Sequence, residues 1–467
     1  MLFSSMTFIG VFLPIVVFLY VISKKELHNF ILLFASIIFY AWGEPKYLAI
    51  MLLTIIANYF GAIAIDKFPK HKKFALISTI LVNLSFLIYF KYFNFLIENC
   101  NNLFHSNIKA LDIVMPIGIS FYTFQAISYV IDVYRKDCKV QNDIYKLALY
   151  ICLFPQLIAG PIVKYHDVAQ QIESREVTFD KVCYGTKRFI IGLSKKMLLA
   201  NTMGAIADKI FVQNPDTFSQ PIAWLGSIAY SLQLYFDFSG YSDMAIGLGM
   251  IFGFRFLENF NYPYISKSVT EFWRRWHISL STWFRDYVYI PLGGNRKGIK
   301  RQILNLFIVW SLTGIWHGAA TNFLLWGLYY FAFLVLEKFV LKKLLDKLPS
   351  WVGHVYALFV VLIGWVLFRA EGMRECAHIL KAMFIPYITN TTYAQLGIYL
   401  QSYAFYLISG ILLAMPVFPK IKEWINTKFK ENISVKVIYY VFVLGIFVLS
   451  IIFLSQATYN PFIYFRF

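Results

Sequence analysis

The chain has 467 residues, of which 59% are hydrophobic and 15% charged, and its formal net charge is +18. A typical soluble domain has about 25% charged and about 45–50% apolar residues, so this composition excludes a soluble monomer. Aromatic residues make up 19% of the chain, which excludes a disordered or fibrous protein. The composition therefore predicts a polytopic membrane protein, built from apolar α-helices.

The positive charge has an ordinary explanation in such a protein, because cytoplasmic loops carry an excess of Lys and Arg. We therefore expect no nucleic-acid partner. The five cysteines are scattered, and no two of them have the spacing of a metal or redox site. The sequence predicts neither a disulfide framework nor a bound metal.

Five apolar runs open the chain, at residues 3–22, 30–42, 47–65, 74–95 and 111–133. Lys24 and Lys25 follow the first run, and the basic segment 67–73 separates the third from the fourth. Both positions become cytoplasmic if the N-terminus lies outside. The charge pattern therefore predicts an outside N-terminus.

The middle of the chain is less regular. The apolar run 144–163 contains Pro and Gly, which are tolerated at membrane depth where a segment is buried in protein or lines a cavity. We expect a bent or re-entrant helix there, followed by a polar cytoplasmic stretch over 164–188. The next apolar run, 223–254, contains Asp237 and Asp243.

The apolar segment 303–336 would be about 50 Å long as one helix, whereas the hydrocarbon core is about 30 Å thick. It must break, and residues 313–322 are where it becomes small and polar. Further runs lie at 355–368, 403–417 and 435–454, and the basic loop 420–430 between the last two is expected on the inside. We expect about eleven to thirteen membrane segments, an outside C-terminus and a single domain over residues 1–467.

Two of the eight histidines stand apart from the rest. Ser268 and Glu271 form a capping box, which predicts a helix over 268–289. On that helix His277 shares a face with Trp273 and Trp276, and the opposite face carries Arg274 and Arg275. His277 is either a functional group or a core histidine with a satisfied hydrogen bond.

His317 lies among small residues inside the longest apolar segment. An ionisable group at membrane depth is costly and is a functional candidate by default. Histidine also suits general-base catalysis near neutral pH. The alternative is a buried histidine that forms hydrogen bonds between helices.

Asp237 and Asp243 do not share a helix face unless Gly240 breaks the helix, and we favour structural hydrogen bonding for both. The stretch 267–301 holds eight Lys or Arg residues against two acids. A phosphate-bearing or acidic partner would use this charge. Membrane topology together with anionic lipid headgroups explains it equally well.

Several of these stretches resemble the membrane-bound O-acyltransferase family, in its alginate O-acetyltransferase-like bacterial branch. The resemblance covers about residues 117–327 and is carried by six sequence words. They are 154–161 (FPQLIAGP), 235–247 (YFDFSGYSDMAIG), 259–268 (NFNYPYISKS), 271–285 (EFWRRWHISLSTWFR), 291–296 (PLGGNR) and 313–319 (TGIWHGA).

The resemblance implies a ring of membrane helices and re-entrant segments around a narrow tunnel, in the bacterial cytoplasmic membrane. It implies that His317 is the essential histidine and His277 the second one. It also implies transfer of an acetyl group from a cytoplasmic thioester, of coenzyme A or an acyl-carrier protein, towards an exported polysaccharide. No permanently bound cofactor is expected, and an exported acetyltransferase is the expected acceptor partner.

On this reading, further residues near the histidines bind the donor: Trp273, Arg274, Arg275, Trp276, Asn261 and Trp316. Asp237 and Asp243 line the tunnel or have structural roles. D-alanyl transfer to teichoic acid is the alternative function, although residues 291–296 and Asp243 favour acetylation. A transporter is a more distant alternative, and it would be favoured by inverted repeats, which the sequence does not show.

Overall fold

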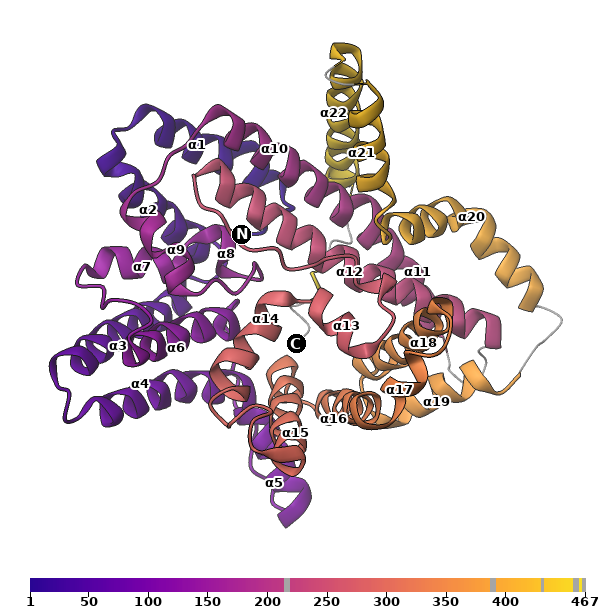
Figure 1. Ribbon diagram of the computed structural model, residues 1–467, viewed down its shortest axis with the longest axis horizontal. Coiled ribbons are helices and arrows are strands. Elements are labelled where there is room, and N and C mark those ends of the chain that lie inside the picture. Colours follow the sequence, from indigo (N-terminus) through magenta and orange to yellow (C-terminus); the bar gives the residue numbers. More distant parts are fainter. Residues whose placement is uncertain (214–218, 387–391, 430–431, 457–461, 464–467) are drawn as a thin grey trace. The chain divides into compact units, whose positions relative to one another are not determined.

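The computed structural model describes residues 1–213, 219–386, 392–429, 432–456 and 462–463. Within these ranges the chain forms helices and connecting loops, without a β-strand (Figure 1). Six of the described helical segments are long and apolar enough to cross a membrane: Pro45–Lys67, Lys72–Phe104, Thr321–Leu345, Ser350–Arg369, Thr392–Leu413 and Ile433–Gln456. The prediction of an all-α polytopic membrane protein is confirmed, whereas the exact number of crossings stays a prediction.

Backbone contacts divide the chain into two compact units. Unit 1 comprises Met1–Phe189 and Tyr241–Glu258, and unit 2 comprises Ile190–Gly240 and Asn259–Phe467. Two of the three boundaries fall inside helices α10 (Phe179–Ser194) and α12 (Gln220–Ile251), and the third lies in the segment after α12. The single domain, the ring and the central tunnel stay predictions.

Unit 1 begins with an aromatic cluster, in which Phe8 packs against Phe3, Phe39 and Phe154. Helices α3, α4 and α6 pack against one another, and α2 packs against α7. The helices of this unit, besides its parts of α10 and α12, are α1 (Leu13–Ile22), α2 (His28–Ala41), α3 (Leu48–Lys67), α4 (Lys72–Leu87), α5 (Phe93–Phe104), α6 (Ile119–Arg135), α7 (Ile144–Cys152), α8 (Phe154–Leu157) and α9 (Tyr165–Glu173).

The interruption expected within residues 144–163 is confirmed. Helix α7 ends at Cys152, α8 is a single turn, and residues 158–164 have no regular helix. Gln156 is buried here and donates a 2.6 Å hydrogen bond to the Tyr150 carbonyl oxygen. Side-chain bonds of this kind replace some of the backbone bonds that an irregular buried segment loses.

Unit 2 contains the helices that carry both candidate histidines. They are α11 (Asn201–Phe211), α13 (Val269–Arg275), α14 (Ile278–Phe284), α15 (Gly298–His317), α16 (Thr321–Leu336), α17 (Lys342–Leu345), α18 (Ser350–Arg369), α19 (Met373–Phe384), α20 (Thr392–Leu413), α21 (Val417–Phe429) and α22 (Ile433–Gln456). Short π- and 3₁₀-helical segments adjoin the α-helices of both units: η1 (Phe8–Phe12), η2 (Lys25–Leu27), η3 (Pro45–Tyr47), η4 (Ile88–Tyr92), η5 (Lys195–Ala200), η7 (Pro263–Ile265), η8 (Arg285–Tyr289) and η9 (Glu337–Leu341).

The apolar segment 303–336 is a helical hairpin. It breaks at residues 318–320, inside the stretch where the sequence predicts a break, and α15 packs along α16 (Figure 1). Two glycines allow this close approach. A Cβ atom on Gly314 would lie 2.5 Å from the Phe323 carbonyl oxygen, and one on Gly327 would lie 2.3 Å from that of Trp310. The backbones of the hairpin therefore touch directly, as at small-residue interfaces of membrane helices.

This contact predicts that Gly327→Ala destabilises the protein by about 1–3 kcal/mol, because the added methyl group overpacks the hairpin. Gly445→Ala in α22 is the matched control, since a Cβ atom there would meet nothing within 4 Å. Alanine should be neutral or favourable at that position, because it is the better helix former. Thermal unfolding of the purified proteins in detergent measures both effects, and equal midpoints for the two variants would contradict the prediction.

Candidate active site

The region around His277 is not the continuous helix that the sequence predicts. Helix α13 ends at Arg275 and α14 begins at Ile278. His277 between them has a φ of +44°, in the left-handed region. This conformation costs a non-glycine residue about 1–2 kcal/mol, so other contacts must hold it. The prediction of one helix over 268–289 was wrong, and the helix faces predicted for that range do not continue past His277.

Asn259 supplies those contacts. Its carbonyl oxygen accepts a 3.0 Å bond from the Ile278 N–H, and its side-chain Oδ1 accepts from the Ser279 N–H at 3.1 Å and the Ser279 hydroxyl at 2.9 Å. Oδ1 also lies 3.2 Å from His277 Nδ1. An amide oxygen only accepts, so Nδ1 carries the proton in this bond, and the neutral ring keeps its lone pair on Nε2.

Asn259 was not among the site residues predicted from the sequence. The word NFNYPYISKS opens with two asparagines, Asn259 and Asn261, which alternate with aromatic residues, and this pattern does not distinguish the first from the second. The side chain of Asn259 is 1% exposed, and a buried amide requires hydrogen-bond partners. Asn259 therefore orients the His277 ring and stabilises the loop that carries it.

Helix α13 begins where the capping box predicts. The Ser268 hydroxyl accepts from the Glu271 N–H at 3.0 Å, and a Glu271 carboxylate oxygen accepts from the Lys267 N–H at 2.9 Å. The buried carboxylate of Glu337 adds a second cap, because it accepts from the Val269 N–H at 2.6 Å and the Thr270 N–H at 3.0 Å. Partial burial raises the pKa of Glu271, but the Lys267 N–H and the Arg275 guanidinium outweigh it and leave this pKa below its ordinary value.

His317 is the last residue of α15 and is 6% exposed. Aromatic rings surround it at steep angles: Trp326 at 4.8 Å, Trp316 at 4.9 Å and Phe368 at 5.3 Å between ring centroids. The glycine that follows, Gly318, lies against the ring of Phe323. His317 thus lies where a helix ends inside an aromatic environment.

Trp316 contacts both candidate histidines. Its ring centroid lies 6.2 Å from that of His277 and 4.9 Å from that of His317. The ring of Phe238 packs edge-on against His277 at 4.6 Å. The structure therefore gathers the two histidines, 40 positions apart in the sequence, around a shared indole.

Trp273 and Trp276 are buried in the aromatic core of unit 2. Trp273 contacts Trp310 at 4.9 Å and Tyr330 at 4.8 Å, and Trp276 contacts Trp365 at 4.9 Å. These contacts hold α13 against the helices that carry His317 and its neighbours. Donor binding by Trp273, Trp276 and Trp316 stays a prediction.

Arg274 and Arg275 have different environments. Arg275 is neutralised by Glu271, with an N–O distance of 2.8 Å, and it also donates to the Asn261 carbonyl oxygen at 3.1 Å. Arg274 is exposed and has no ion pair among the described residues. It lies close enough to Lys338 to repel that cation, as does Lys342. Arg274 is therefore the stronger candidate for binding an anionic group, and Arg275 and Asn261 hold the loop in place.

Asp237 and Asp243 are not brought together. Helix α12 continues through Gly240, so Gly240 does not break the helix. Asp237 forms a buried ion pair with Lys196 at 2.7 Å and accepts a 2.8 Å bond from the Ile463 N–H. Asp243 belongs to unit 1 and binds Arg188 at 2.8 Å. Both carboxylates have structural contacts, and a role in a tunnel stays a prediction.

The described residues contain no cluster of three or more His, Cys, Asp or Glu side chains that could hold a metal ion. The expected absence of a metal stays a prediction. What the site offers is a pair of buried imidazoles in aromatic surroundings. Such a site can move a proton to or from a hydroxyl, and its exclusion of water protects a reactive ester from hydrolysis.

Comparison with known proteins agrees with this chemistry. The model of the membrane-bound O-acyltransferase family (MBOAT) matches residues 140–370. The chain is 40% identical to the probable alginate O-acetylase of Pseudomonas putida, with both chains covered completely. It is 34% identical to the peptidoglycan O-acetyltransferase of Helicobacter pylori, over 82% of this chain and 80% of the relative. It is 31% identical to the teichoic acid D-alanyltransferase of Bacillus subtilis, over 56% and 70%.

The buried ion pair predicts a large effect for Lys196→Met, which leaves the Asp237 carboxylate buried without its cation. Breaking such a pair costs about 3–5 kcal/mol. Adding Asp237→Asn should restore most of the stability, because the amide is uncharged and still accepts from the Ile463 N–H. Lys195→Met, at the more exposed neighbouring lysine, is the control. Thermal unfolding is the measurement, and a double variant no more stable than Lys196→Met would refute the account.

Proposed function

The chain belongs to the membrane-bound O-acyltransferase family, in its alginate O-acetyltransferase-like branch, and we propose that it passes an acetyl group from a cytoplasmic thioester across the membrane for O-acetylation of an exported polysaccharide. The observation that carries this proposal is the buried pair His317 and His277 around Trp316. The names of the alginate- and peptidoglycan-modifying relatives support acetyl as the group and a polysaccharide as the destination.

In the proposed reaction His317 is the general base. It removes the proton of an acceptor hydroxyl as the hydroxyl oxygen attacks the thioester carbonyl. The carbon–sulfur bond then breaks, the acetyl group stays on the acceptor oxygen, and the thiolate takes up a proton to leave as a thiol. His277, held by Asn259, orients the donor or the base. The aromatic surroundings exclude water, which would otherwise consume the thioester.

The proposed donor is acetyl-coenzyme A or an acetylated carrier protein. Both carry phosphate groups, and the exposed cation Arg274, close to Lys338, offers them a binding surface. D-alanyl transfer would require an aminoacyl carrier instead. The teichoic acid relative covers a smaller share of this chain than the acetylating relatives do, which favours acetyl.

We place the chain in the bacterial cytoplasmic membrane, with its N-terminus and C-terminus outside. The basic segments 67–73 and 420–430 then lie inside, as the positive-inside rule requires. The donor reaches His317 from the cytoplasm and the acceptor from outside. Membrane lipid is the surrounding partner.

The general-base role predicts that His317→Ala lowers acetyl transfer to about 1% of wild type or less, since such a base contributes about 10²–10⁴-fold. Thermal stability should stay near that of wild type. His71→Ala, at an exposed histidine in a basic loop, should leave activity unchanged. The assay follows release of free thiol from acetyl-coenzyme A together with label on an acceptor. Retention of more than a few per cent of transfer by a folded His317→Ala protein would exclude the role.

We further propose that the acetyl group passes to a separate exported acetyltransferase. The longest polar stretch, 164–188, is predicted to be cytoplasmic, and an independent glycan-binding domain needs at least about 50 residues. A polymer is also too bulky for a dry site around His317, whereas a single hydroxyl on a partner is not.

The relay predicts no polymer acetylation by liposomes that contain only this chain, with acetyl-coenzyme A inside and candidate polymer outside. Addition of the exported partner should start the reaction. The His317→Ala chain with the same partner is the control and should stay inactive. Robust acetylation of polymer without any added protein would overturn the relay.

A further inference from the structure

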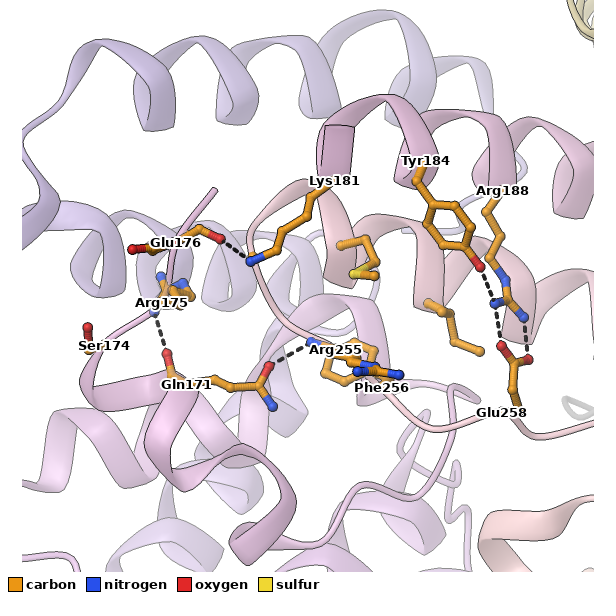
Figure 2. A pocket seen from close by; sticks show the side chains of 13 residues that line it. Gln171, Ser174, Arg175, Glu176, Lys181, Tyr184, Arg188, Arg255, Phe256 and Glu258 are labelled. Carbon is orange, nitrogen blue, oxygen red and sulfur yellow. Dashed lines mark hydrogen bonds and ion pairs between the residues drawn. The ribbon is translucent and has the colours of Figure 1, made fainter. Parts of the chain in front are cut away.

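Unit 1 contains a pocket of about 610 Å³, and none of the residues that line it was given a role in the proposed reaction (Figure 2). Its walls come from the end of α9 and the loop after it, the start of α10, the end of α12 and the segment that follows. The volume lies in the range of sites that bind small molecules, about 300–1,000 Å³. Its charged lining residues are Arg175, Glu176, Lys181, Arg188, Arg255 and Glu258.

One of the four cations is neutralised from within the unit. Arg188 donates to Asp243 at 2.8 Å. It also forms a two-pronged ion pair with Glu258, which Figure 2 shows. Burial alone would lower the pKa of Arg188, but the two carboxylates hold it above its ordinary value. Arg188 is therefore a structural cation that joins α10 to α12 and to the segment after it.

Arg175 is held by neutral groups. Its guanidinium donates to Asn29 Oδ1 at 2.6 Å, to the Phe252 carbonyl oxygen at 2.9 Å and to the Tyr20 hydroxyl at 3.2 Å. None of these acceptors carries a formal charge, so they fix the position of the cation without cancelling it. The fixed charge of Arg175 therefore adds positive potential at the pocket, which attracts an anion.

Two more cations lie at the pocket without a carboxylate partner. Lys181 donates to the Glu176 carbonyl oxygen at 2.8 Å. The backbone of Arg255 is anchored by Gln171 Oε1 at 2.7 Å, and its exposed guanidinium has no ion pair among the described residues. Among the described lining residues, Glu258 is paired with Arg188, and Glu176 is the one other acid. Three cations thus face one carboxylate.

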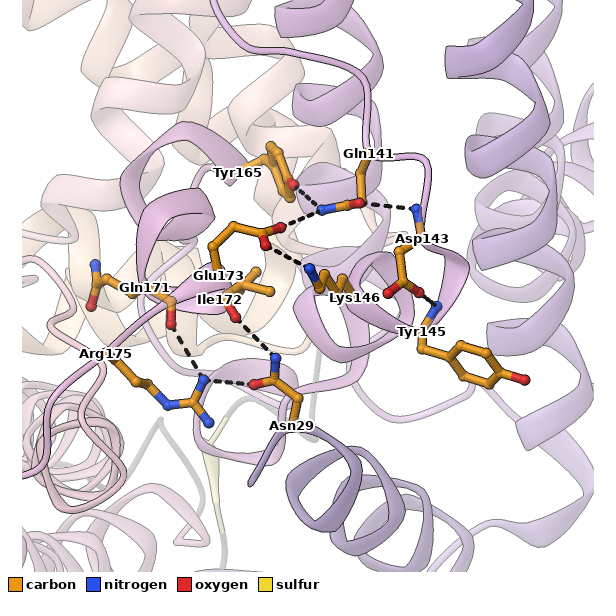
Figure 3. A network of polar contacts seen from close by, with 10 residues as sticks. All are labelled: Asn29, Gln141, Asp143, Tyr145, Lys146, Tyr165, Gln171, Ile172, Glu173 and Arg175. Atoms are coloured by element: carbon orange, nitrogen blue, oxygen red, sulfur yellow. Dashed lines mark hydrogen bonds and ion pairs between the residues drawn. The ribbon is translucent and has the colours of Figure 1, made fainter. Parts of the chain in front are cut away.

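A polar network stiffens the wall that α9 provides (Figure 3). Glu173 pairs with Lys146 at 2.5 Å, and Gln141 donates to the Tyr165 hydroxyl at 3.0 Å. Asn29 donates to the Ile172 carbonyl oxygen at 2.9 Å while it accepts from Arg175. The network ties α9 to α7 and α2, so the cationic lining is in place before any ligand arrives.

The pocket also has an apolar part, formed by Ile246, Met250 and Phe256. A small inorganic anion would use only the cations, whereas an ester of phosphate with an apolar or aromatic group would use both surfaces. Arginine binds phosphate through paired N–H groups. We propose that this pocket binds a phosphate ester, with Arg255 and Lys181 on the phosphate, the fixed positive charge of Arg175 close by, and the apolar residues on the esterified group.

Two sources carry this chemistry: the headgroup of an anionic phospholipid, and the nucleotide part of a soluble coenzyme. Residues 171–188 of the lining belong to the stretch that the charge pattern predicts to be cytoplasmic, where both are available. Binding at this pocket needs neither His317 nor transfer, so it can be tested separately from the proposed function.

The test measures binding to the detergent-purified full chain by native mass spectrometry and titration. The probes are dioleoylphosphatidylglycerol, dioleoylphosphatidylcholine and adenosine 3′,5′-bisphosphate. We expect the wild-type chain to bind at least one of the two anionic probes in preference to the choline lipid. Arg255→Ala should weaken that binding roughly tenfold or more, because a charge-assisted hydrogen bond is lost, and Arg255→Lys should retain part of it.

Lys139→Ala is the control, because it removes one exposed cation of unit 1 outside the pocket. Arg255 is itself exposed, so its replacement should leave folding intact, which thermal unfolding verifies. A response of the glycerol lipid alone identifies a membrane source, and a response of the bisphosphate alone identifies a soluble one. Absence of binding by both anionic probes, or equal binding by wild type, Arg255→Ala and Lys139→Ala, would overturn the proposal.

Discussion

Asn259 holds the backbone of residues 277–279 in a reversal that a helix would not make, and the geometry around both histidines depends on this interaction. The left-handed conformation at His277 is unfavourable for a residue with a side chain. The hydrogen bonds to Asn259 offset it, since they satisfy two backbone N–H groups and a buried hydroxyl. The reversal separates two neighbours: Trp276 packs against Trp365, and His277 meets Phe238 and Trp316.

The sequence predicted those parts of this arrangement that local signals determine. Ser268 and Glu271 marked the start of α13, because a capping box is complete within four residues. The small residues around His317 marked the break between α15 and α16. The break at His277 has no such signal, since an apolar period of 3.6 residues continues across it. Its cause, Asn259, lies 18 positions earlier, and the bonds it accepts exist only in the folded chain.

Contacts that exist only in the folded chain also explain why one further residue was not predicted and why two others were not distinguished. Glu337 caps α13 from 68 positions away, so it resembles any acid at the end of an apolar run. Arg274 and Arg275 are equivalent in a charge count, yet Glu271 neutralises one and not the other. The chain has a net charge of +18, and the placement of its Lys and Arg residues predicts an orientation in the membrane. This placement does not say which cations are available to a ligand, because that depends on the partners that folding provides.

Pairing of charges also bears on why the proposed reaction occurs where it does. In unit 2 the buried cation Lys196 is matched by Asp237, and the uncompensated cation Arg274 stays at the exposed surface. The rings nearest to His317 are aromatic and carry no formal charge. Electrostatic interactions are strongest where water is excluded. An unpaired buried charge near the histidines would therefore dominate the electrostatic energy of the transition state. Because the charged side chains named here are either paired or exposed, the imidazole of His317 can carry out the proposed proton transfer without interference from a neighbouring charge.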